Sequence, residues 1–248
     1  AADPRPNPSL QMSSHREFLL SLECPESSRA PLKLPLMSSP TKLVFVGGLG
    51  EFGMNFLVIE TEEAALIVDC GFQFPDAEHL GIDVLIPDFA YLETISRKKK
   101  MALAITHAHE DHVGAVPFLL QGWSMPVYST PYTLGFVRER AKEYELRGLD
   151  FRAVAPGDTF TCGDIKVEAV GITHSILQPL AFFLTTPGGT IYHSGDFKID
   201  LHPSDDSHFD LERIRALGDG GCDLALTDST NAERHGHTAS ESTVAGPV

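Results

Sequence analysis

Thr106-His107-Ala108-His109-Glu110-Asp111-His112 is the stretch of sequence that decides the fold. It follows a short apolar run, which predicts that the motif starts where a buried strand ends. Because His107 and His109 are two residues apart, an extended backbone can point both to one side. Asp111 and His112 begin the next helix and can reach a second ion. Imidazole and carboxylate are ligands that zinc accepts in catalytic sites, so the stretch predicts a metal centre instead of a polar turn with incidental histidines.

Apolar runs on both sides of this motif predict a sheet-rich α/β domain. The predicted strands lie at 43–46, 56–59, 65–68, 102–105, 165–170, 180–185, 190–193 and 224–227, and the predicted helices at 112–121, 131–147 and about 210–217. Strand runs separated by so few helices are typical of a layered sheet domain and not of a regular βαβ repeat.

Further polar residues stand where other predicted strands end. His174 follows the run 165–170, Asp196 follows 190–193, and Asp69 follows 65–68. Asp228 occupies a similar place after the last run. Taken singly, each also fits a satisfied polar side chain or ordinary turn chemistry.

Composition limits the classes of function. The 248 residues suffice for one large α/β domain or two small ones. A net charge of −15 argues against a wide basic surface for nucleic acid, although two bound divalent ions would add roughly four positive charges at the site itself. The four cysteines show no close CxxC spacing, which favours a reducing compartment. No apolar run approaches the roughly 20 residues of a membrane span, so we expect a cytoplasmic protein without a membrane partner.

The chain divides into two parts. Residues 1–40 are rich in Pro and Ser and lack sustained periodicity, which predicts a disordered leader or a non-native remnant. Residues 41–248 then carry all the predicted strands and helices and form the domain.

The ordered motifs resemble the ribonuclease J family, in the β-CASP group of the metallo-β-lactamase superfamily. The resemblance covers about residues 42–246 and corresponds to the N-terminal part of that family. It rests on the histidine motif and on Gly47-Gly48-Leu49-Gly50-Glu51-Phe52-Gly53-Met54-Asn55, Val68-Asp69-Cys70-Gly71, Leu80-Gly81-Ile82-Asp83, Ile86-Pro87-Asp88-Phe89, His174-Ser175-Ile176, His193-Ser194-Gly195-Asp196-Phe197-Lys198 and Thr227-Asp228-Ser229-Thr230-Asn231-Ala232-Glu233-Arg234. It implies the metallo-β-lactamase fold, an αββα sandwich.

The resemblance also implies a set of site residues. It assigns His107, His109 and His174 to a first zinc ion, Asp111 and His112 to a second, and Asp196 to both. Asp111, His112 and Asp196 would be the catalytic residues. Asp69 would orient a ligand histidine. The implied cofactors are two Zn²⁺, with Mn²⁺ or Mg²⁺ open in their place or beside them.

The implied function is a zinc-dependent hydrolase that cleaves single-stranded RNA, as a 5′-to-3′ exonuclease and an endonuclease, through a metal-activated hydroxide. The chain ends at Val248, where a β-CASP domain would start in this family, so we expect an incomplete fold without the family's last ligand histidine and RNA clamp. Two alternatives stay open: a small-molecule hydrolase such as a β-lactamase, and a non-catalytic fragment that binds RNA or a partner. Association with itself or with other RNA-processing proteins is also left open.

Overall fold

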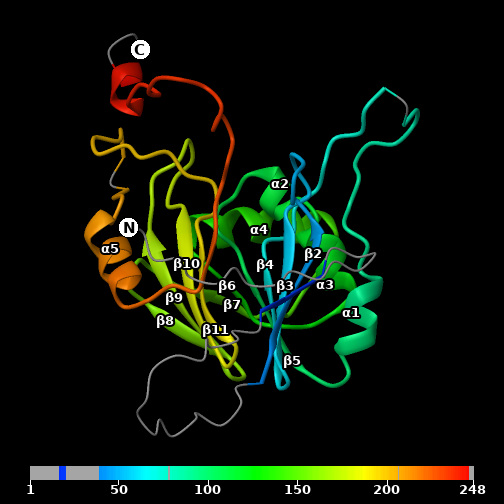
Figure 1. Cartoon of the computed structure of the whole chain (residues 1–248). Coiled ribbons are helices and arrows are strands. Elements are labelled where there is room, and N and C mark those ends of the chain that lie inside the picture. The colour runs from blue at the N-terminus through cyan, green and yellow to red at the C-terminus, as the bar shows by residue number, and fades with distance from the viewer. Residues whose placement is uncertain (1–16, 21–38, 78, 206, 246–248) are drawn as a thin grey trace, which may run out of the picture.

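Two β-sheets packed face to face form the centre of the domain (Figure 1). The computed structural model describes residues 17–20, 39–77, 79–205 and 207–245. The seven-stranded sheet contains, in spatial order, β1 (Glu17–Leu20), β2 (Thr41–Gly47), β3 (Phe56–Glu60), β4 (Ala64–Val68), β5 (Lys100–Ala104), β6 (Val127–Ser129) and β7 (Phe151–Ala153). The five-stranded sheet contains β12 (Leu224–Leu226), β11 (Gly189–His193), β10 (Leu180–Thr186), β9 (Ile165–Gly171) and β8 (Thr159–Cys162).

Helices cover the outer faces of both sheets. The helices are α1 (Ala90–Ile95), α2 (Glu110–Val113), α3 (Val116–Gly122), α4 (Pro131–Glu143) and α5 (Leu211–Asp219), and a 3-10 turn, η1, spans Glu241–Ala245. The first four helices lie on the seven-stranded sheet, and α5 lies on the five-stranded sheet (Figure 1). This order of layers confirms the predicted αββα sandwich.

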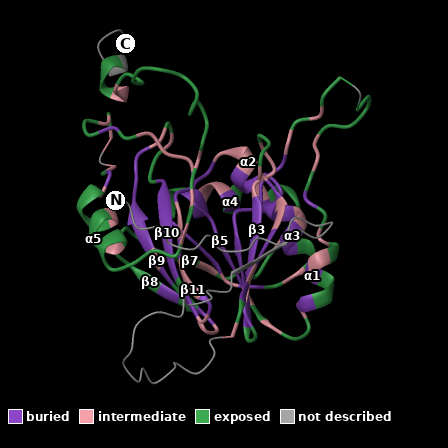
Figure 2. Ribbon diagram, in the orientation of Figure 1, coloured by how far each residue is buried: buried purple, intermediate pink, exposed green. Residues whose placement is uncertain are grey.

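Alternation along β3 shows why the sequence builds these layers. Successive side chains of a strand point to opposite faces. Phe56 and Val58 therefore face the helices, while Leu57 and Ile59 face the other sheet. All four are buried, and burial of one such side chain contributes roughly 1.5–3 kcal/mol. Figure 2 shows the result: the central strands, such as β3, β4 and β10, are buried, whereas α5 is largely exposed.

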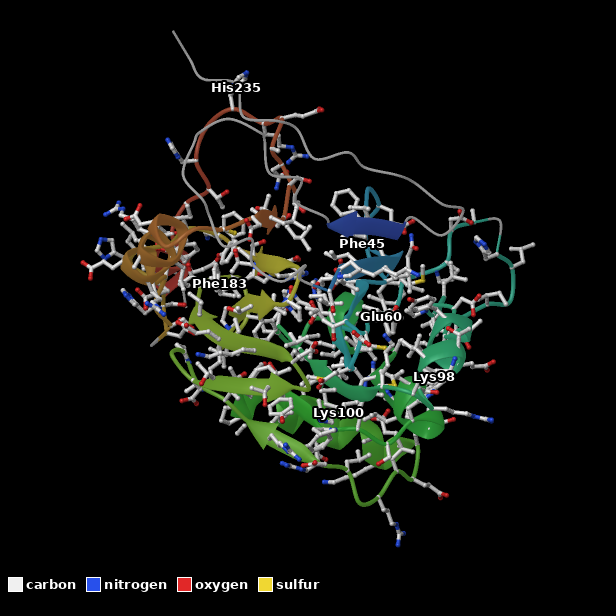
Figure 3. All side chains as sticks on the ribbon, turned by 60° about the horizontal axis from the view of Figure 1, so that its bottom comes forward. Phe45, Glu60, Lys98, Lys100, Phe183 and His235 are labelled. Carbon is white, nitrogen blue, oxygen red and sulfur yellow. The ribbon has the colours of Figure 1, made fainter. Side chains whose placement is uncertain are left out.

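A smaller apolar cluster fixes α5 against the outer face of the five-stranded sheet. Phe183 of β10 and Phe209 are buried in it, and Ile214 and Leu217 of α5 pack against them. Figure 3 shows Phe183 on the side of the sheet where α5 lies. This packing stabilises α5, which lies where the sequence predicted a helix, at about 210–217.

The strand topology determines where the polar residues meet. Strands β1 to β4 are antiparallel neighbours, but β4, β5, β6 and β7 run parallel. Val68 pairs with Ala104 at the carboxyl ends of β4 and β5, and the backbone N–H of Asp69 donates to the Ala104 carbonyl at 2.9 Å. The residues that follow both strands therefore emerge at one edge, beside α2 in Figure 1.

Several predicted boundaries were wrong. The helix expected at 112–121 is two helices, α2 and α3, and Pro117 stands in the first turn of α3, where its missing N–H costs no hydrogen bond. The helix expected at 131–147 ends at Glu143. Helix α1 and strands β6, β7 and β8 were not predicted, because runs as short as 151–153 carry too little periodicity.

The predicted disordered leader lies mostly outside the described residues. Strand β1 falls within that range and pairs antiparallel with β2, which the sequence analysis did not anticipate. None of the helices in the described ranges is long and apolar enough to cross a membrane.

Candidate metal centre

Three histidines from two strand ends point their ring nitrogens at one another. His107 and His109 follow β5, and His174 follows β9. The His107 Nε2 to His109 Nδ1 distance is 3.1 Å, and the His174 Nε2 to His109 Nδ1 distance is 3.2 Å. Ligand nitrogens bound to one tetrahedral zinc, with bonds of 2.0–2.1 Å, stand about 3.3 Å apart. The three histidines therefore fit a single metal ion.

A second group adjoins the first. His107, His112 and Asp196 bring one ligand atom each to within 4.8 Å of the others. His112 Nε2 lies 3.3 Å from Asp196 Oδ1, and Asp111 Oδ2 lies 3.6 Å from the same nitrogen. This metal-capable group thus contains His107. Asp111, which the resemblance had assigned to the second ion, lies beside the group.

Asp196 connects the two groups. Its Oδ1 faces His112 at 3.3 Å, and its Oδ2 faces His174 at 4.0 Å. The neighbouring Gly195 has a φ of 57°, and a Cβ there would lie 3.0 Å from the Leu180 carbonyl oxygen. Glycine therefore lets the chain turn sharply after β11, so that one oxygen of Asp196 is directed to each group.

A buried carboxylate fixes the orientation of His112. Asp69 is 1% exposed and lies 2.8 Å, through Oδ2, from His112 Nδ1. Thr106 donates its backbone N–H to Asp69 Oδ1 at 2.7 Å and its hydroxyl to Oδ2 at 2.9 Å. Because His112 Nδ1–H donates to Asp69, the ring presents Nε2 to the site. Asp69 thus contacts a histidine of the motif, as expected for a carboxylate that orients a ligand.

The histidines of the first group favour the neutral form that binds metal. Burial, and then the charges of His112, His174 and His109, hold the pKa of His107 well below 6.5. Burial is also the main cause that lowers the pKa of His109 and of His174. Neutral imidazole is the ligand form, so these rings need lose no proton at neutral pH.

His112 behaves differently because it faces two carboxylates. Burial alone would lower its pKa, but Asp69 and Asp196 outweigh burial and raise the pKa to about 10. Burial alone would raise the pKa of Asp196, but the hydrogen bond and charge of His112 lower it. When no metal ion lies between them, the His112 ring and the Asp196 carboxylate thus form an ion pair at the centre of the site.

A close backbone contact joins β4 to the motif. Cys70 N–H donates to the His112 carbonyl at 2.8 Å, and Phe72 N–H donates to the Glu110 carbonyl at 3.1 Å. A Cβ on Gly71 would lie 1.6 Å from the Asp111 carbonyl oxygen. Only glycine therefore fits between these two segments, which explains its place after Asp69.

The structure also shows which polar residues stay outside the centre. His235 and His237 are exposed and belong to neither metal-capable group found in the described part of the chain. Figure 3 shows His235 at the outer edge of the molecule, away from both sheets. The carboxylate of Asp228 accepts from Thr230 N–H at 2.7 Å, which is turn chemistry.

Sequence reasoning missed one side chain at the site. The amide of Asn55, at the end of the glycine-rich loop, lies 3.1 Å from His112 Nε2. Its only signal in the sequence was its position beside a loop of four glycines, at 47, 48, 50 and 53.

Comparisons with known proteins agree with the fold and the motif. The model of the β-lactamase superfamily domain matches residues 66–245. Curated relatives include ribonuclease J of Helicobacter pylori, 43% identical over 82% of this chain and 30% of the relative, and ribonuclease J of Sinorhizobium meliloti, 41% identical over 83% of this chain and 37% of the relative. Ribonuclease J of Mycobacterium tuberculosis is 40% identical over 86% of this chain and 38% of the relative. The chain therefore spans about a third of the length of these relatives.

Solved structures share the fold at low identity. A protein of unknown function from Enterococcus faecalis V583 aligns with a TM-score of 0.57 at 17% identity, over 80% of this chain and 52% of the other. Zn²⁺-bound PqqB from Methylobacterium extorquens aligns with a TM-score of 0.50 at 14% identity, over 75% of this chain and 66% of the other. With the family model, the shared fold and the histidine-rich sheet edge in agreement, the chain belongs to the β-lactamase superfamily, as a domain of the metallo-β-lactamase fold.

Proposed function

We propose that this domain is a hydrolase that holds two metal ions, zinc in the first instance, and cleaves phosphodiester bonds of RNA. The observation that carries the proposal is Asp196, whose two oxygens face His112 and His174 respectively. A carboxylate so placed can share its oxygens between two ions. The curated relatives named ribonuclease J support RNA as the substrate.

We assign the ligands as the family resemblance implied, and the short distances among His107, His109 and His174 support the first ion. His107, His109 and His174 would hold the first ion, and His112 and Asp111 the second, with Asp196 between them. A bound pair of divalent ions supplies an activated water and stabilises the negative charge that grows on the phosphoryl oxygens. Manganese or magnesium in place of zinc would serve the same chemistry with different geometry.

The chain's own residues divide the remaining work. Asp69 keeps His112 in one tautomer and one orientation. His107 is fully buried and Asp111 has a side chain 40% exposed, so the substrate has access from the Asp111 side. Asp111 Oδ2 is a suitable acceptor for a proton released during attack, because it lies at the open side and 3.6 Å from His112 Nε2.

The test uses the full chain, freed of metal by a chelator and reloaded with Zn²⁺, Mn²⁺ or Mg²⁺. Metal content and cleavage of a 5′-monophosphorylated single-stranded RNA are measured together. Asp196→Asn should bind less metal and lose at least about 100-fold in rate, since it weakens both sites. His79→Ala is the matched control, because His79 is exposed and contacts Asp76. Wild-type protein that binds metal and cleaves nitrocefin but no RNA would overturn the assignment of substrate.

A further inference from the structure

The side-chain amide of Asn55 contacts Asp111 and His112, the two residues of α2 that the proposed function assigns to the second ion. Asn55 Nδ2 donates to the Asp111 carbonyl oxygen at 3.1 Å and to Asp111 Oδ2 at 3.4 Å, and it lies 3.1 Å from His112 Nε2. Among the described residues, Asn55 and His112 are the side-chain partners of the Asp111 carboxylate. The direction of that carboxylate therefore depends on Asn55.

The backbone holds Asn55 in place from both sides. Its N–H donates to the Asp111 carbonyl at 3.0 Å, and its own carbonyl accepts from Gly71 N–H at 3.0 Å. Met54, with a φ of 54°, donates its N–H to the Phe72 carbonyl at 3.0 Å. The loop that ends at Asn55 is thus tied to the segment after β4, whose backbone in turn donates hydrogen bonds to the motif.

A glycine sets the position of the amide itself. Gly48 has a φ of 80°, and a Cβ there would lie 2.4 Å from Asn55 Oδ1. The oxygen end of the amide therefore lies directly against the backbone of the glycine-rich loop, and the nitrogen end faces the motif. Any side chain at position 48 would displace the amide, and its positive φ is one that glycine tolerates best.

The chemistry of the amide suits an outer support of a metal ligand. The Asp69 carboxylate accepts a hydrogen bond from His112 Nδ1–H, and the Asn55 amide donates to the oxygens of Asp111 without adding charge. Groups that hydrogen-bond a ligand fix its orientation, and their loss commonly costs 10- to 100-fold in metal affinity. Asp111 has particular need of such support, because its side chain is 40% exposed and its carboxylate lies 3.6 Å from His112 Nε2.

We propose that Asn55 is a positioning residue of the second metal site, which holds Asp111 beside His112 so that both can bind one ion. This inference rests on the two-metal centre proposed above. The inference concerns metal affinity at the second site alone. An experiment can therefore distinguish its failure from a failure of the whole two-metal centre.

The experiment is a cobalt titration of the metal-free full chain, followed by visible absorption and by calorimetry. Wild type should take up two ions. Asn55→Ala should keep the first site and bind the second ion 10- to 100-fold more weakly. Gly48→Ala should act in the same direction, because it displaces the amide without removing it. Gln121→Ala is the matched control, since Gln121 is an exposed amide on α3, and it should bind like wild type.

A double-mutant cycle separates positioning from general support of the fold. If Asn55 acts through Asp111, then Asn55→Ala should have little further effect on second-site affinity in an Asp111→Ala background. Additive losses, or equal weakening of both sites by Asn55→Ala, would overturn the proposal. Two ions bound by Asn55→Ala as tightly as by wild type would also overturn it and leave the centre intact. Wild type that binds no cobalt would remove the centre and this inference together. If Asn55→Ala does not fold, Asn55→Ser replaces it in each of these measurements, because the serine hydroxyl is too short to reach Asp111.

Discussion

Replacing Asp69 by Asn tests whether the buried carboxylate supports the centre. The carboxylate accepts hydrogen bonds from Thr106 N–H, Thr106 Oγ1 and His112 Nδ1, all within 2.7–2.9 Å. Both Asp69 and His112 are nearly inaccessible, at 1% and 2% exposed. The variant has nearly the same shape, but it brings a neutral amide with N–H donors into a position that needs acceptors.

The size of the effect follows from the burial. Breaking a buried ion pair by removal of one partner costs about 3–5 kcal/mol. For a chain of this length, 1 kcal/mol shifts Tm by roughly 2–4 °C, so Asp69→Asn should lower Tm by roughly 6–20 °C. Urea unfolding in the presence of a chelator gives the free energy of unfolding without a contribution from metal binding.

The control is Asp219→Asn, because Asp219 is exposed at the end of α5. It should change the free energy of unfolding by less than about 0.5 kcal/mol. If Asp69→Asn were equally mild, the contacts of Asp69 would contribute little, and the argument that it fixes His112 would fail. When metal is added, Asp69→Asn should also bind it 10- to 100-fold more weakly.

Two further predictions concern the cysteines and Gly71. In a Cys24→Ser background, because Cys24 lies outside the described residues, the exposed Cys222 should react with a thiol reagent at pH 8 far faster than the buried Cys70 and Cys162. Burial raises the pKa of both buried thiols. The pKa of Cys162 rises to about 11, so the labelling of Cys162 should accelerate as the pH approaches that value. Equal labelling rates at pH 8 would contradict this. Gly71→Ala should destabilise the chain by more than about 3 kcal/mol, because its Cβ would lie 1.6 Å from a backbone oxygen of the motif turn, and an unchanged urea midpoint would refute that close approach.

The sequence predicted which polar side chains meet at the edge of the sheets better than it predicted the elements around them. His107, His174 and Asp196 stand at the ends of apolar runs, and the two sheets bring those ends together. The strands themselves were predictable because they are buried on both faces and read as continuous apolar runs. By contrast, a local turn at Gly114 separates α2 from α3. A periodic pattern of apolar residues does not reveal such a turn.

Other features escaped prediction because they depend on contacts distant in sequence. Asn55 contacts the site only because the folded chain brings the glycine-rich loop against Asp111, which is 56 residues later in the sequence. Strand β1 exists by pairing with β2, although the residues around it have the composition of a disordered leader. Pairing of this kind depends on the partner strand and not on local propensity. The assignment of metal ions to the gathered ligands stays a prediction.

Charge connects the arrangement of the centre to its proposed substrate. The buried side of the centre consists of His107 and His112, and its accessible side includes the carboxylates of Asp111 and Asp196, 40% and 31% exposed. A phosphodiester that approaches the metal-free site meets these carboxylates and a chain of net charge −15, so the electrostatic field repels it. The two divalent ions of the proposed function would reverse the sign of the local charge while leaving the rest of the surface acidic. Binding and cleavage of RNA by this domain should then depend on bound divalent ions, because those ions would add positive charge where the carboxylates of Asp111 and Asp196 are exposed.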